Sequence, residues 1–221
     1  MPEATSERTA TAAAWSFEGY HRVPRPMRLD PAPVQLDILF LYSRPPLPMT
    51  RGDELTVSHL LAFFAARGHR VDVVSLKGKG ERLRPEHQRW LEAHCRSVRF
   101  VEQSRLAALW QGGLGVLRGW PFQIGYLYVP GQLAAARELV AERHYDLAYA
   151  YTARTAEVLR RLDHGIAARL LALQVSQTLN TRRLAENAAR LIERLFYRFE
   201  SWRMAAYESR VWQIVDRTVL I

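Results

Sequence analysis

The chain of 221 residues has a single cysteine, Cys95, so it cannot form a disulfide bond within itself. A chain without such a bond is typical of a reducing compartment. It has no run of about 18 apolar residues, which argues against a transmembrane helix. Its first 19 residues include early acidic side chains and no continuous apolar stretch, so a secretory signal is not indicated. These absences predict a cytoplasmic protein.

Several catalytic signatures are also missing. There is no GxxxxGK(S/T) phosphate loop, no GxGxxG after a strand and no GxSxG nucleophile elbow. The seven histidines lack the spacing of metal ligands, and no Asp-x-Asp occurs, so neither a metal nor a cofactor is indicated. The cluster of Gly112, Gly113 and Gly115 follows no strand, and it favours close packing or a flexible loop over a phosphate cradle.

Charge is the first positive signal. Lysine and arginine total 31 against 22 acidic residues, a formal net charge of +9. Such a balance indicates an anionic partner, which could be nucleic acid, anionic lipid or a phosphorylated substrate. No nucleic-acid-binding module or stacking motif is recognisable, so we expect no nucleic-acid partner.

Short apolar runs alternate with amphipathic segments along most of the chain. Strands are predicted at residues 37–42, 70–76, 97–101, 146–151, 168–173 and 217–221, and helices at 54–67, 85–94, 131–143, 154–162 and 181–213. In the first helix an apolar stripe recurs every three to four residues, and Gly68 is placed to end it. This alternation predicts an α/β fold, a Rossmann-like, doubly wound, mainly parallel sheet that binds ligands at the carboxyl ends of its strands.

The two ends of the chain differ from this pattern. Residues 1–34 are rich in alanine, threonine and proline, and they predict a disordered or extended tail before an ordered domain at 35–221. The last predicted strand has no helix after it to cover an apolar edge. We therefore expect further polypeptide, and a second domain, beyond residue 221.

Four segments, in this order, resemble family 4 glycosyltransferases. Residues 46–75 combine a loop carrying Gly52-Asp53, a helix with His-Leu-Leu at 59–61, and Arg-Gly-His at 67–69 before a valine-rich strand. The other three are GWPFQIGY at 119–126, DLAYAYTAR at 146–154 and QVSQTLNTRR at 174–183. Most members carry Gly-Gly in the loop. Gly52-Asp53 is similar to the bacterial exopolysaccharide-type subgroup of sugar transferases.

This resemblance implies a retaining GT-B enzyme of the hexosyltransferase type, with an active site between two Rossmann-like domains. The chain would be its N-terminal, acceptor-side half, and most contacts with the nucleotide-sugar donor would come from a C-terminal domain that these residues do not include. We expect the half to be inactive alone in moving sugar to a polysaccharide or to an anionic or lipid-linked glycan acceptor. No catalytic residue can be assigned.

Candidate ligand-facing residues begin with the loop after the first strand. Gly52 would let backbone amides approach a phosphate at a helix N-terminus. Asp53 could contact a ligand or simply cap the helix. Arg44 and Arg51 flank the loop and could neutralise phosphate, or could be solvated surface arginines.

Further candidates follow the fourth and fifth strands. Tyr151 stands where many family members have a histidine nearby, which removes support for a histidine-based role. Arg154 matches an arginine of the subgroup and could bind an anionic acceptor. Asn180 could face a ligand or cap the long helix, and Arg183 completes the candidate set.

A membrane surface is a further candidate partner. Residues 106–129 mix leucines with Trp110, Trp120 and tyrosines, and the long helix carries many arginines. Such a segment could lie on anionic lipid at the inner face of the plasma membrane, or it could be a buried helix and loop. A non-catalytic module that binds glycolipid, membrane or a protein partner is therefore the alternative function.

Overall fold

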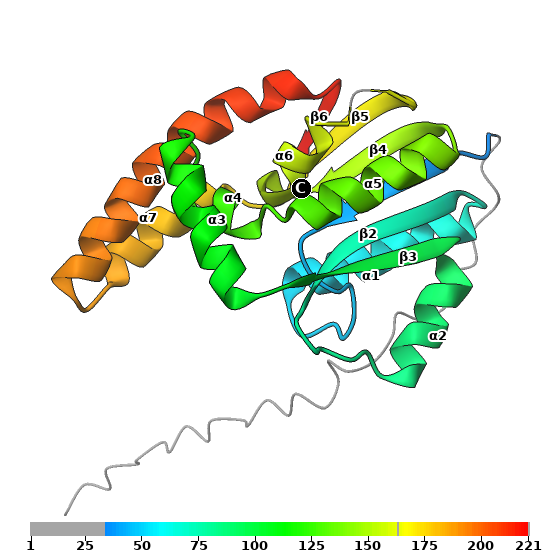
Figure 1. The fold of residues 1–221 in the computed structure, drawn as a ribbon, viewed down its shortest axis with the longest axis horizontal. Helices are drawn as coiled ribbons and strands as arrows, with labels where there is room; N and C mark the ends of the chain where they lie inside the picture. The colour runs from blue at the N-terminus through cyan, green and yellow to red at the C-terminus, as the bar shows by residue number, and fades with distance from the viewer. Residues whose placement is uncertain (1–33, 163, 221) are drawn as a thin grey trace, which may run out of the picture.

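The computed structural model describes residues 34–162 and 164–220 (Figure 1). In this part of the chain, six strands form one sheet in which every neighbouring pair is parallel, with the order β3-β2-β1-β4-β5-β6. The strands are β1 (Asp37–Tyr42), β2 (Arg70–Gly78), β3 (Ser97–Gln103), β4 (Tyr145–Tyr151), β5 (Ile166–Leu173) and β6 (Arg217–Leu220). The predicted Rossmann-like, doubly wound α/β fold is confirmed, with the reversal of strand order between β1 and β4.

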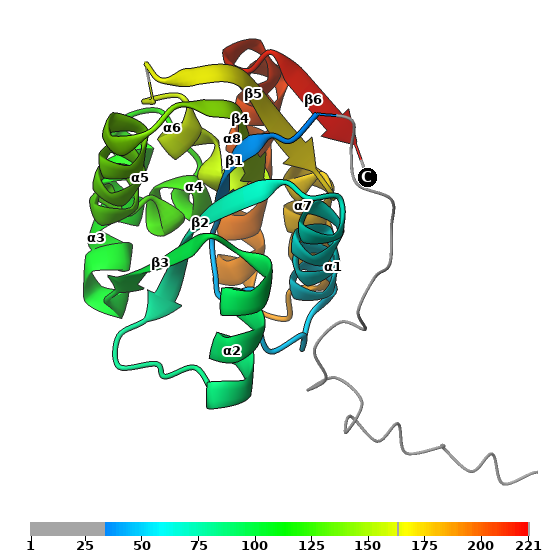
Figure 2. The same ribbon diagram turned by 90° about the vertical axis from the view of Figure 1, so that its right-hand side faces the viewer.

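Helices cover both faces of this sheet (Figure 2). They are α1 (Gly52–Ala66), α2 (Pro85–His94), α3 (Arg105–Leu117), α4 (Phe122–Leu127), α5 (Pro130–Glu142), α6 (Ala156–Leu159), α7 (Gln177–Asn187) and α8 (Leu191–Val211). Side chains of α1 and α2 share one apolar core with the sheet, whereas α5, α6 and the end of α8 share the other. Helices α3, α4, α7 and most of α8 extend beyond the carboxyl ends of the strands (Figure 1).

The central strand β1 shows why this sequence forms a buried sheet. Its alternate residues Ile38 and Phe40 enter the core beneath α1, and Leu39 and Leu41 enter the core beneath α5. All four side chains are fully buried, so an apolar run without polar alternation is what a strand covered on both faces requires.

Helix α1 ends as predicted but begins differently. Gly68 follows its C-terminus with φ at 81°, the left-handed conformation that favours glycine. At the other end the N-cap is Arg51, whose backbone amide donates to the Glu54 carboxylate at 3.0 Å. Asp53 therefore lies inside the first turn, and the predicted alternative of Asp53 as the N-cap is wrong.

The single helix predicted at 181–213 is wrong: two helices, α7 and α8, are joined by a turn at 188–190. They pack side by side in a hairpin (Figure 1). The carboxylate of Glu208 explains the reversal, since it accepts the backbone amides of Gln177 and Thr178 at 2.6 and 3.3 Å. The N-cap of α7 is Ser176, so Asn180 does not cap a helix.

Residues 106–129, predicted as either a membrane-surface segment or a buried helix with a loop, form α3 and α4. A methyl group at Gly112 would stand 2.5 Å from the Phe122 ring, and one at Gly115 would stand 2.7 Å from the Cα of Gly125. Of the two roles predicted for the glycine cluster, close packing is confirmed at Gly112 and Gly115, whereas a methyl group at Gly113 would meet nothing within 4 Å. The alternative of a flexible loop is wrong, because all three glycines lie inside α3. One face of α3 is therefore packed on α4, and its other face is exposed.

Smaller differences between prediction and structure concern the ends of helices and strands. The helix predicted at 154–162 is a 3₁₀ turn, Ala153–Thr155, followed by the single turn of α6. The predicted tail at 1–34 lies outside the described residues except for Val34, and Ile221 of the last predicted strand lies outside them too.

Candidate functional site

A pocket of about 330 Å³ opens where the carboxyl ends of β1, β4 and β5 meet the N-termini of α1 and α7. It is lined by Arg44, Arg51, Gly52, Asp53, Thr152, Arg154, Gln174, Val175, Gln177 and Asn180. Strands β1 and β4 flank the point where the strand order reverses, which is where doubly wound sheets bind ligands. The architecture of the sheet thus places this pocket at the expected ligand edge.

Six of the eight residues selected from the sequence line this one pocket, namely Arg44, Arg51, Gly52, Asp53, Arg154 and Asn180. The other two lie elsewhere. Tyr151 is fully buried in the core, where its ring meets that of Tyr42 edge-on at 5.6 Å. Arg183 is exposed on α7 and is not part of the lining. Tyr151 therefore packs beneath the pocket rather than lining it.

The lining of the pocket is positively charged. It has three arginines and one acidic residue, Asp53, which pairs with the Nε atom of Arg44 at 3.3 Å. Arg154 is half-buried, and its Nε atom has no hydrogen-bond partner among the described residues. Burial and then the charge of Arg44 lower the pKa of Arg154. An anion in the pocket would relieve this uncompensated positive charge.

Thr152, directly after β4, has a strained backbone at the wall of the pocket. Its φ of 71° and ψ of 157° are rare for a β-branched residue and cost on the order of 1–3 kcal/mol. Its side chain is only 7% exposed, and its Oγ1 atom has no hydrogen-bond partner in the described part of the chain. Strained residues are concentrated at functional sites, and a buried hydroxyl without a partner can still bind a ligand.

Gly52 leaves the N-terminus of α1 open. A Cβ atom at this position would meet nothing within 4 Å, so neither the backbone conformation of Gly52 nor its packing requires glycine. The absent side chain instead gives a ligand free access to the backbone amides of the first turn.

Sequence reasoning missed Thr152 and the two glutamines that complete the wall. Gln177 accepts a weak hydrogen bond from Arg154 at 3.4 Å, and Gln174 donates to Thr56 of α1 at 3.1 Å. Both glutamines lie in segment 174–183, which carries part of the family resemblance. That resemblance is the sequence signal by which they could have been found. The residue type of Thr152 carries no signal of its unusual φ.

A larger hollow of about 660 Å³ lies at the edge of the sheet formed by β3, against α2. Cys95 lines it, and burial followed by the charge of Asp72 raises the pKa of this thiol to about 12. A thiol with such a pKa stays protonated at neutral pH and is a poor nucleophile. We therefore do not assign the site to this hollow.

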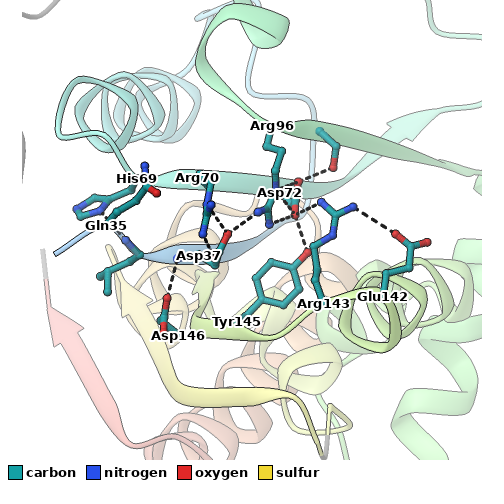
Figure 3. Close-up of polar contacts among 12 residues, drawn as sticks. Gln35, Asp37, His69, Arg70, Asp72, Arg96, Glu142, Arg143, Tyr145 and Asp146 are labelled. Atoms are coloured by element: carbon teal, nitrogen blue, oxygen red, sulfur yellow. Dashed lines mark hydrogen bonds and ion pairs between the residues drawn. The ribbon is translucent and has the colours of Figure 1, made fainter.

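The amino edge of the sheet holds a buried ionic network that sequence reasoning also missed (Figure 3). Asp72, fully buried, accepts from Arg96 at 2.5 Å and from the Tyr145 hydroxyl at 2.6 Å. Asp37 pairs with Arg70 and Arg96 in the same network. It ties β1, β2 and β4 to the segment before β3 at the edge opposite the pocket, so its role is structural. Acidic residues within apolar strands were the signal for it.

Metal ligation and membrane spanning find no support in the described residues. Their His, Cys, Asp and Glu side chains form no group of three or more that could hold a metal ion. None of the described helices is both long and apolar enough to cross a membrane.

Comparison with known proteins adds no relative: no family model, curated protein or solved structure matches the chain.

Proposed function

We propose that the chain is the acceptor-side, Rossmann-like half of a retaining GT-B glycosyltransferase that resembles family 4, of the kind used in bacterial polysaccharide biosynthesis. The observation that carries this proposal is the convergence of six ligand-facing candidates, from the segments that follow three separate strands, on one basic pocket at the carboxyl edge. The resemblance of segments 46–75, 119–126, 146–154 and 174–183 supplies the reaction class.

The pocket suits an acceptor that carries phosphate. Arg51 and Arg154 supply guanidinium groups, and the open first turn of α1 at Gly52 supplies backbone amides. Thr152 adds a hydroxyl without a partner among the described residues. A lipid-linked sugar phosphate or diphosphate presents the matching charge, and the nucleotide-sugar donor would contact mainly a second domain.

Binding to the full chain tests the acceptor half of this proposal. The probe is a short-chain polyprenyl diphosphate-linked hexose, measured by calorimetry beside the same hexose without phosphate. We expect the phosphorylated probe to bind and Arg154→Gln to weaken binding at least tenfold, since a charge-assisted hydrogen bond contributes about 1.5–3 kcal/mol. The control Arg82→Gln removes an exposed arginine outside the pocket. Equal binding of both probes, or no effect of Arg154→Gln, would contradict the proposal.

The transfer step needs a separate assay. The chain is mixed with a separately expressed donor-side GT-B domain and labelled nucleotide-hexoses, and label is counted in the lipid extract. We expect incorporation only when both polypeptides are present. If no nucleotide-hexose gives incorporation although the acceptor probe binds, the proposed transferase activity is rejected and a non-catalytic binding function remains.

That second candidate is a non-catalytic module that binds glycolipid, and it is favoured by large apolar side chains exposed on α3 and α8. It predicts the same acceptor binding with no dependence on a nucleotide-sugar. The two candidates therefore share a pocket and differ in the transfer assay.

A further inference from the structure

Helix α8 has an apolar face directed away from the domain. Leu191, Ile192, Leu195, Phe199 and Trp202 recur on one side of the helix, and all five are exposed. Leu191 and Trp202 are 68% and 67% exposed. The opposite side carries Met204 and Val211, which are buried. Helix α8 therefore has two apolar sides, one buried in the core and one exposed to solvent.

Helix α3, which lies at the same end of the molecule as α8 (Figure 1), carries a second exposed apolar face. It consists of Leu106, Leu109, Trp110 and Leu117, of which Leu117 is 84% exposed. The two helices are joined where Arg203 of α8 donates to the carbonyl oxygen of Val116 at 2.8 Å. We call these two faces of α3 and α8 the apolar patch. Exposed apolar surface of this kind marks an interaction site.

The charges around the apolar patch have one dominant sign, because two of the three acidic residues of α8 bind other segments of the chain and the third, Glu193, is paired with Arg190. Glu200 accepts the amides of Phe122 and Gln123 at 2.8 and 2.9 Å, and Glu208 caps α7. A groove of about 390 Å³ between α7 and α8 is lined by Arg182, Arg194 and Arg198, with Glu186 as its one acidic residue. Basic side chains therefore border the apolar face of α8.

We propose that the apolar patch docks the protein on an anionic phospholipid bilayer, with the apolar side chains in the acyl boundary and the arginines of the groove on headgroup phosphates. Charge complementarity selects this occupant: a helix with outward leucine, phenylalanine and tryptophan beside arginine fits an anionic interface. Trp110 and Trp202 are of the residue type enriched at that depth. The proposal does not depend on sugar transfer. It would bring the basic pocket, at the same carboxyl edge, close to lipid-linked ligands.

Flotation of the full chain with vesicles tests the docking. The vesicles contain phosphatidylcholine alone or with one-third phosphatidylglycerol, at low and high salt. We expect binding to the anionic vesicles only, weakened by salt. Arg194→Gln with Arg198→Gln should lower the partition coefficient roughly 25-fold, at about fivefold for each arginine. Ile192→Gln with Leu195→Gln should lower it roughly tenfold or more.

Matched controls separate docking from misfolding. Arg82→Gln with Arg89→Gln makes the same charge change around α2, and Leu55→Gln replaces an exposed leucine of α1. Both controls should bind vesicles like the unchanged chain, and all variants should keep its circular dichroism and melting temperature. Equal flotation with neutral vesicles, or equal losses in controls and patch variants, would overturn the proposal. The proposal would also be overturned if the chain bound no vesicles and instead formed a stable dimer that Leu195→Gln dissociates. Binding of the acceptor probe is measured separately, in solution without detergent. The proposed function and the proposed membrane docking can therefore fail independently.

Discussion

At the scale of single residues, Asp72 is the side chain whose loss should cost most. It is fully buried, and Arg96, Ser97 and Tyr145 all donate to it. Removing the carboxylate leaves the part-buried Arg96 paired with Asp37 alone and takes the acceptor from the Tyr145 hydroxyl, and breaking a buried network of this kind costs about 3–5 kcal/mol. We expect Asp72→Ala to lower the free energy of unfolding by about that amount in urea titrations. The control Glu186→Ala breaks an exposed ion pair with Arg182 and should cost less than about 1 kcal/mol. Similar costs for both would contradict a structural network.

The same network predicts acid sensitivity. Burial raises the pKa of Asp72, but hydrogen bonds from Arg96 and Ser97 outweigh burial and leave this pKa below 3.8, and the pKa of Asp37 is lowered in the same way. The unfolded chain therefore binds more protons as pH falls. The contribution to stability should be complete above about pH 5 and be lost progressively as pH falls through 3.8 and below. Urea unfolding between pH 7 and pH 3 measures it. An unchanged pH slope in Asp72→Asn would count against this origin.

The candidate residues show how much of a functional site can be predicted from residue type and position in the sequence. Gly52 and Arg154 were predicted because they follow strands, and strand ends meet at one edge in a parallel sheet. Tyr151 was selected by the same logic but shares the buried side of β4 with Tyr149, which strict alternation along the strand would have indicated. The strained backbone of Thr152 depends on the tertiary surroundings of the turn, so no local pattern predicts it.

At the scale of elements, the contact between α3 and α4 gives a prediction with an internal control. A methyl group at Gly115 would stand 2.7 Å from the Cα of Gly125, and backbone cannot move aside cheaply. Gly115→Ala should therefore destabilise the protein by at least about 1–3 kcal/mol. A methyl group at Gly113, in the same helix, would have nothing within 4 Å, so Gly113→Ala should stabilise by about 0.4–1 kcal/mol. Thermal melting compares the two. A shift of the same sign in both variants would argue against close packing.

The α7–α8 hairpin shows where sequence prediction of elements fails. An unbroken apolar stripe predicted one helix, because periodicity records amphipathicity and contains no information on a reversal at 188–190. Glu208 on α8 holds the first turn of α7 through Gln177 and Thr178, a contact between residues about 30 positions apart. Strands β1 and β2 were predicted well, since their apolar runs are determined by burial on both faces.

Glu208→Gln is expected to loosen this hairpin. The variant removes a charge-assisted cap, so it should lower the free energy of unfolding by about 1–2 kcal/mol and speed amide hydrogen exchange in residues 177–187. The control Glu193→Gln changes an exposed side chain at the start of α8, 3.8 Å from Arg190, and should change neither quantity measurably. Unchanged exchange in α7 of Glu208→Gln would show that packing alone holds the hairpin.

At the scale of the whole molecule, occupancy of the pocket should be visible in global stability. A ligand that binds only the folded state at ten times its Kd adds about 1.4 kcal/mol, or roughly 3–6 °C in Tm for a chain of this size. We expect pyrophosphate to raise the Tm of the full chain. Gly52→Ala should leave the Tm without ligand unchanged or slightly higher, since its methyl group meets nothing within 4 Å, yet it should reduce the rise because the methyl group shields the helix amides. Differential scanning calorimetry with and without pyrophosphate, and with sodium chloride at matched ionic strength, separates site binding from general screening. An equal rise in Tm for both proteins would place the anion away from the N-terminus of α1.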